Sequence, residues 1–181
     1  MGQYYKVIIL ADNTSNKKEI IRFWICPGSY RNGMKLMEHS YYKNNLLKAV
    51  QNFLSPNGHF YMSRIIWAGD YADVEKETGQ NLYHMAESQE SVYFPPVDNS
   101  KYNYLVNHTK KEYVDMKKLN YDEDYIIHPL PLLVAEGNGR GGGDYSGHNM
   151  EMCGRWTRDI ISFEEKCPEE YNEIVPNFIE E

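Results

Sequence analysis

Hydrophobic residues occur in short runs that are separated by polar turns. Residues 4–10 and 19–25 are two such runs, and their spacing predicts a β-hairpin. Between residues 44 and 54 the apolar positions instead recur at helical spacing. Asn44 or Asn45 is suited to cap the start of that helix. The pattern therefore predicts a pair of strands followed by one amphipathic helix.

Four further runs indicate strands: residues 61–68, 102–107, 111–116 and 154–163. The second and third are separated by only three residues, which suits another hairpin. Strands that come in hairpin-like pairs favour an α+β fold over a doubly wound parallel one. We predict a single α+β domain over residues 1–181, with a mainly antiparallel or mixed twisted sheet and one or two amphipathic helices.

Three segments remain open between alternatives. Residues 73–89 are polar enough for a surface helix or an ordered loop. Residues 126–134 are apolar but contain two prolines, which fits a buried extended segment or a helix that begins at Pro131. The acidic C-terminal segment, residues 168–181, is expected to form a short helix or a tail.

Composition narrows the classes of partner. A net charge of −7 disfavours general binding of duplex nucleic acid, but one or two cations with backbone amides still suffice to hold a phosphate. No apolar run approaches the roughly 20 residues of a membrane span, so no membrane association is predicted. The three cysteines form no CxxC pair, which fits a reducing cytosol and predicts a cytoplasmic location.

The most distinctive stretch is the glycine-rich segment at residues 136–147. Six of the 13 glycines lie there, together with Asn138, Arg140 and Asp144. The stretch matches neither a Walker A loop nor a dinucleotide-binding fingerprint. We predict that its backbone amides and Arg140 bind a small phosphorylated or nucleotide-like ligand, with Asp144 binding a hydroxyl or a metal. The alternative is a surface connector in which Arg140 is solvated.

A second stretch repeats part of this pattern. Trp67, Asp70 and Tyr71 follow a predicted strand, and Gly-Asp-Tyr occurs here and again at residues 143–145. We predict that Asp70 and Asp144 meet at one site that takes donor groups or a divalent cation. Trp67, Tyr71 or Tyr145 would offer a ring for stacking. The alternatives are a core role for Trp67 and a turn-capping role for Asp70.

Two other functions remain as alternatives. A metal-assisted hydrolase would use His39, Asp70 and Asp144 as catalytic residues, although His39 also fits a surface or interface position near a helix start. A non-catalytic interaction or inhibitor protein would bind a host protein through the 16 tyrosines and the acidic segment at residues 168–181.

Several stretches spread over most of the chain carry a resemblance: residues 1–6, 33–40, 67–72, 105–113, and the region from 129–133 through 143–145. They resemble uncharacterised proteins of large DNA viruses, phages and some bacteria, a family with no known activity. The resemblance implies a soluble viral protein in the host cytosol. It implies no particular cofactor or catalytic residue.

Overall fold

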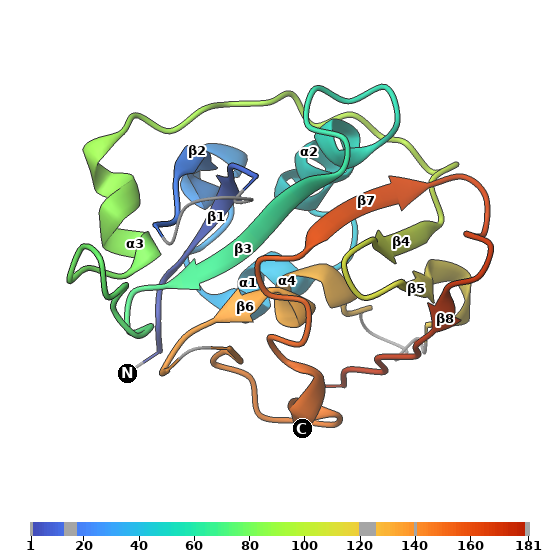
Figure 1. The fold of residues 1–181 in the computed structure, drawn as a ribbon. Helices are drawn as coiled ribbons and strands as arrows, with labels where there is room; N and C mark the ends of the chain where they lie inside the picture. Colours follow the sequence, from blue (N-terminus) through green and yellow to red (C-terminus); the bar gives the residue numbers. More distant parts are fainter. Residues whose placement is uncertain (1, 13–17, 120–125, 140, 180–181) are drawn as a thin grey trace.

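The computed structural model describes residues 2–12, 18–119, 126–139 and 141–179. Within them, the strands form one sheet in the order β2-β1-β3-β7-β4-β5-β8, with β6 paired to β3 (Figure 1). The strands are β1 (Tyr5–Leu10), β2 (Ile21–Ile25), β3 (Ser63–Gly69), β4 (Tyr104–Asn107), β5 (Glu112–Asp115), β6 (Ala135–Glu136), β7 (Ile160–Glu164) and β8 (Asn172–Glu173). Among the described pairs of named strands, only β3–β6 and β5–β8 are parallel, which confirms the α+β fold with a mixed sheet.

The helices are short, and α2 is the longest of those described. They are α1 (Leu36–Ser40), α2 (Asn45–Leu54), α3 (Leu82–Met85) and α4 (Pro129–Leu133). The side chain of Asn44 accepts a hydrogen bond from the Leu47 amide and caps α2, as predicted. None of the helices within the described residues has the length and apolar character that a membrane span requires.

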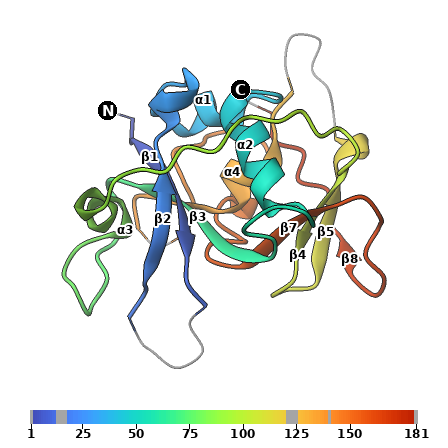
Figure 2. The same cartoon turned by 90° about the horizontal axis from the view of Figure 1, so that it is seen from above.

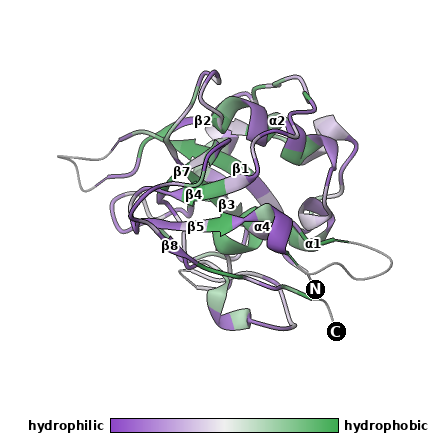
Figure 3. Ribbon diagram, turned by 90° about the vertical axis from the view of Figure 1, so that its right-hand side faces the viewer, coloured by the Kyte–Doolittle hydropathy of each residue, from purple (hydrophilic) through white to green (hydrophobic). Residues whose placement is uncertain are grey.

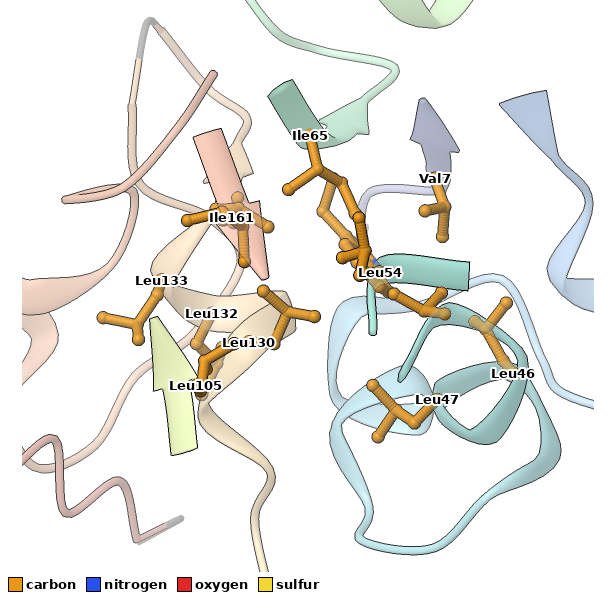
Figure 4. Close-up of a cluster of buried hydrophobic side chains, with 14 of the residues drawn as sticks. Val7, Leu46, Leu47, Leu54, Ile65, Leu105, Leu130, Leu132, Leu133 and Ile161 are labelled. Carbon is orange, nitrogen blue, oxygen red and sulfur yellow. The ribbon is translucent and has the colours of Figure 1, made fainter. Parts of the chain in front are cut away.

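The sheet carries a hydrophobic core on each face. Val7 and Ile9 of β1 point to the larger core, which α2 and α4 complete. Figure 4 shows this core in close-up. Ile8 and Leu10 point the other way and pack against α3. Alternation along the strand explains this division, since successive side chains point to opposite faces. Figure 3 shows hydrophobic residues concentrated on strands and helices, with hydrophilic residues along much of the connecting chain.

The structure resolves the open segments and corrects two boundaries. Residues 73–89 are mostly loop, with helix only from Leu82 onward. The proline-rich stretch is a helix that begins at Pro129 rather than Pro131, because prolines fit the first turn of a helix. The last long strand begins at Ile160 and not at residue 154. The preceding residues form turns, in which Gly154 and Arg158 take left-handed φ angles of 74° and 66°.

The C-terminal segment also differs from the expected helix or tail. It contains β8, which pairs with β5. Phe178 is buried and packs edge-on against Tyr145, with ring centroids 5.4 Å apart. The segment is acidic but has two apolar contacts with the core, and burial of those side chains holds it against the domain.

A long segment without helix or strand connects the region of α3 to β4. We call residues 89–103 the strap. It crosses the molecule past α2 (Figures 1 and 2). The Tyr30 hydroxyl donates to the Phe94 carbonyl at 2.8 Å and holds the first half of the strap. The Phe94 ring packs against Phe23 and Phe53, so the strap is anchored by burial as well as by hydrogen bonds.

Candidate functional site

The two Gly-Asp-Tyr loops lie against the same stretch of chain, immediately before β1. The Asp144 carboxylate accepts a hydrogen bond from the Gln3 amide at 3.0 Å. The Asp70 carboxylate accepts one from the next amide, that of Tyr4, also at 3.0 Å. The two aspartates are therefore placed at adjacent residues, and each carboxylate binds a backbone donor of the protein itself.

The Gln3 side chain fills the space between these loops. Its Oε1 atom accepts a hydrogen bond from the Asn138 amide at 3.1 Å. A Cβ atom added to Gly137 would lie 2.4 Å from that oxygen, and one added to Gly69 would lie 2.9 Å from it. These two glycines are therefore explained by close packing against Gln3. Gln3 Nε2 is sealed from solvent and bonds no described group, which leaves one unsatisfied donor in this region.

Three other glycines serve the backbone conformation of the loop. Gly139, Gly141 and Gly142 have φ angles of 114°, 88° and 72°, and an added Cβ at any of them would meet nothing within 4 Å. Glycine is the residue that adopts such angles without strain. Arg140 lies outside the described residues, so its role in binding an anion stays a prediction.

Trp67 and His39 are bonded to each other inside the core. Trp67 Nε1 donates to His39 Nδ1 at 3.1 Å, and the other ring nitrogen of His39 lies 2.8 Å from the Gly33 carbonyl oxygen. Burial lowers the pKa of His39 to about 4, so the ring is neutral at pH 7. The expectation of a surface position for His39 is wrong, because its side chain is fully buried. Both ring nitrogens are occupied, and neither is available to a metal or a substrate.

The two tyrosines of the repeated pattern have different surroundings. Tyr71 is 51% exposed and presents its ring to solvent. Tyr145 is buried, and its hydroxyl lies 2.9 Å and 2.8 Å from the carbonyl oxygens of His148 and Ile179. Tyr145 therefore fixes the C-terminal segment, while Tyr71 is the exposed ring of the pair.

Metal ligation would need more donors than these loops provide. Across the described ranges, no three His, Cys, Asp or Glu side chains are grouped so that they could hold a metal ion. A divalent cation at Asp70 and Asp144 thus has no third His, Cys, Asp or Glu ligand among the described residues.

A second region, which the sequence did not single out, is a cavity of about 230 Å³ between α2, the strap and the chain leading into α4. Its walls combine rings and aliphatic groups: Tyr42, Leu47, Tyr102, Met116, Ile126 and Phe163. Polar and charged side chains make up the rest of the lining, so apolar and polar surface are about equally represented in the walls.

Two lysines line this cavity together with one carboxylate. Lys43 is exposed, and no described carboxylate lies within ion-pair distance of it. Lys48 Nζ lies 3.9 Å from Asp98 Oδ2, and the Asp98 side chain is 78% exposed. Exposed pairs at such a distance contribute little energy, so Lys48 is readily available to another anion.

His128 also lines the cavity. Its Nδ1 accepts from the Leu130 amide at 3.1 Å, which caps the start of α4. Burial lowers the pKa of His128 to about 3, so the ring is neutral and Nε2 carries the proton. No described residue accepts a hydrogen bond from Nε2. The ring stacks on Tyr42, with centroids 5.8 Å apart and an angle of 22° between the planes.

The strap closes one side of the cavity. Gln51 on α2 donates through Nε2 to the carbonyl oxygens of Asn99 and Tyr102, at 3.0 Å and 3.1 Å. These bonds position the strap residues that line the cavity. Residues from α2, the strap and the start of α4 therefore line one partly open cavity.

The sequence did not predict this cavity, because its lining residues form no local sequence motif. Leu47 and Gln51 are four residues apart and share a face of α2, which is a weak signal at best. The strap and His128 come from segments about 50 and 80 residues farther along the chain. The Nδ1 atom of His128 caps α4, and this local role gives no sign of the cavity.

Comparison with known proteins assigns this chain to no family. No family model, curated protein or solved structure matched the chain. The resemblance to viral and phage proteins therefore stays a prediction.

Proposed function

We propose that this protein binds a small phosphorylated or nucleotide-like ligand in the cavity beside α2. The observation that carries the proposal is that Lys43 and Lys48 both line a cavity walled by aromatic rings. Ammonium groups bind phosphate, and aromatic rings offer faces for a planar ring of the ligand.

The size of the cavity suggests that only part of the ligand enters it. A volume of about 230 Å³ is below the roughly 300–1,000 Å³ typical of pockets that enclose drug-sized ligands. The cavity suits a heterocyclic ring, and the charged group would lie at the opening. Lys43, which is exposed, is suited to bind a phosphate there.

The net charge of −7 is compatible with this proposal. Surface charges farther away than the Debye length of about 8 Å are screened at physiological salt, so the nearest cations dominate. Asp98 is the opposing charge at the cavity, and a phosphate would compete with it for Lys48.

The loops are a weaker location for the same ligand. Asp70 and Asp144 already accept backbone hydrogen bonds, and Trp67 is fully buried. The hydrolase alternative loses His39, because both of its ring nitrogens are bonded. Binding of a host protein, a viral origin and a cytoplasmic location stay predictions that no observation here favours further.

The proposal is tested by calorimetric titration of nucleoside monophosphates into wild type and the double variant Lys43→Ala/Lys48→Ala. We expect wild type to bind at least one member and the double variant to lose about tenfold or more in affinity, because each charged hydrogen bond contributes about 1.5–3 kcal/mol.

A matched control is Lys166→Ala, which removes an exposed lysine that does not line the cavity. It should bind as wild type does. Equal loss of affinity in Lys166→Ala and the double variant would show only a general charge effect. Absence of binding to every nucleotide by wild type would refute the proposed function.

A further inference from the structure

We infer that His128 is a specificity-determining residue, which selects ligands whose enclosed ring directs a carbonyl oxygen toward Nε2 of its imidazole. This inference rests on the proposed function, since it concerns the same cavity. It names the ligand class more narrowly: nucleotides with a keto ring rather than an amino ring at the enclosed edge.

The hydrogen bond made by the His128 imidazole determines which of its two ring nitrogens can act as a donor. A backbone amide can only donate, so the Leu130 amide requires Nδ1 of His128 to be the acceptor. A neutral imidazole then carries its proton on Nε2. The side chain is 97% buried, with 3% of its surface exposed, and it cannot rotate without breaking the cap of α4.

Neighbouring rings hold the imidazole in this orientation. The stacked Tyr42 ring lies on one side, and the Phe163 ring lies 5.9 Å away at an angle of 56°. Both of these residues also line the cavity. A ligand ring that enters the cavity therefore meets a fixed donor and not an adaptable polar group.

A fixed donor discriminates between ligands of nearly the same shape. A ring carbonyl accepts its hydrogen bond, whereas an exocyclic amino group presents a second donor and leaves both groups unpaired. Leaving buried polar groups unpaired is costly, and the structure supplies no other described acceptor for Nε2. Inosine and adenosine monophosphates form one matched pair, since they differ at the 6-position. Uridine and cytidine monophosphates form another at the 4-position.

Two substitutions of His128 distinguish its role as a donor to the ligand from its role in capping α4. In His128→Asn, the side-chain oxygen takes the position of Nδ1 and still caps α4, because asparagine is a favoured capping residue. The donor at Nε2 is lost. In His128→Gln, the amide nitrogen reaches the position of Nε2, while the cap to the Leu130 amide is lost.

We expect wild type to bind the keto member of at least one pair about tenfold more tightly than the amino member. His128→Asn should abolish this preference at near-wild-type thermal stability, and His128→Gln should retain a preference at reduced stability. Titration calorimetry gives the affinities, and circular dichroism gives the melting temperatures.

The possible failures are distinguishable. Equal affinity within both pairs in wild type, or an unchanged preference in His128→Asn, would overturn the role of His128 and leave the lysine-dependent binding intact. No binding of any of the four nucleotides would overturn the proposed function and this inference together. The Lys43→Ala/Lys48→Ala variant separates these outcomes, since it should weaken both members of a pair equally.

Discussion

The Gly-Asp-Tyr loops and the cavity beside α2 each gather side chains suited to binding, but their polar groups have different partners. In the loops, Asp70 and Asp144 bind the amides of Tyr4 and Gln3. In the cavity, His128 Nε2 bonds no described residue, and Lys48 has only a distant pairing with Asp98. Carboxylates that accept hydrogen bonds from the protein's own amides stabilise the fold, whereas side chains that line a cavity without a close partner are available to a ligand.

The comparison teaches that a distinctive sequence does not by itself indicate a ligand site. The glycines at 69 and 137 are explained by the Gln3 side chain that packs against them. The residues that line the cavity form no recognisable sequence motif. We therefore expect substitutions in the loops to change stability and substitutions in the cavity to change binding.

The expected effect that involves both regions at once concerns pH, because one buried neutral histidine lines the cavity and another is bonded to Trp67. Burial lowers the pKa of His39 to about 4 and that of His128 to about 3, whereas both are about 6.5 in the unfolded chain. Below pH 6.5 both histidines become protonated in the unfolded chain but stay neutral in the native state. The stabilisation is complete above that pH and is lost as the pH falls toward 4 for His39 and toward 3 for His128.

Urea unfolding should show a loss of about 2–3 kcal/mol in stability between pH 6 and pH 5, since each histidine contributes up to 1.36 kcal/mol per pH unit. His128→Asn should lose only about half as much over the same interval. Replacement of the exposed His148 by Asn should leave the full loss. A wild type with constant stability over this interval would contradict the buried neutral state of both rings.

Trp67 gives the largest expected effect of a single substitution. Trp67→Ala should lower the free energy of unfolding by about 3–5 kcal/mol, because a fully buried ring and its bond to His39 are lost. Tyr71→Ala, at the exposed ring of the same loop, should change it by no more than about 0.5 kcal/mol. A Trp67→Ala protein of normal stability that fails to bind nucleotide would move the ligand site to the loops.

Gly137→Ala tests the packing of the loops against Gln3. The added methyl group would lie 2.4 Å from Gln3 Oε1 and 2.5 Å from the Tyr5 hydroxyl, so we expect a loss of about 1–3 kcal/mol. Gly28→Ala is the matched control, since its nearest neighbour, Cys26 Sγ, is 3.7 Å away. Equal melting temperatures for the two variants would contradict the packing role of Gly137.

The smallest expected effect is a change in ligand affinity on substitution of Asp98 at the cavity. Asp98→Asn removes the negative charge that pairs with Lys48, and it should tighten binding of a phosphorylated ligand about two- to fivefold. The gain should shrink at 0.5 M salt because exposed charges are screened. Calorimetry at two salt concentrations measures both. Weaker binding in Asp98→Asn would assign Asp98 to the ligand rather than to Lys48.

Much of the fold could be predicted from local patterns. The hairpin of β1 and β2, the hairpin of β4 and β5, and α2 with its Asn44 cap all depend on residues close in sequence. The order of the strands could not be predicted, because β3 pairs with β1 and β7 across long intervening segments. Local patterns also misplaced the start of β7, where turns occupy an apparently extended run.

The candidate site was harder to predict for the same reason. The meeting of Asp70 and Asp144 at one segment followed from their shared Gly-Asp-Tyr pattern, but their partners, the Gln3 and Tyr4 amides, carry no sequence signal. Every main-chain amide is a potential donor, so sequence alone cannot say which carboxylates are already satisfied. The cavity depends on how α2, the strap and α4 pack, which is a property of the tertiary structure.

The most direct test of the central claim is a nuclear magnetic resonance titration of the ¹⁵N-labelled protein with inosine monophosphate, with assigned backbone amides. We predict concentration-dependent shifts at residues 42–51 and 98–103 and at His128, with residues 70–73 and 137–145 unchanged. Shifts confined to the two Gly-Asp-Tyr loops, or no shifts at millimolar ligand, would contradict the assignment of the ligand site to the cavity beside α2.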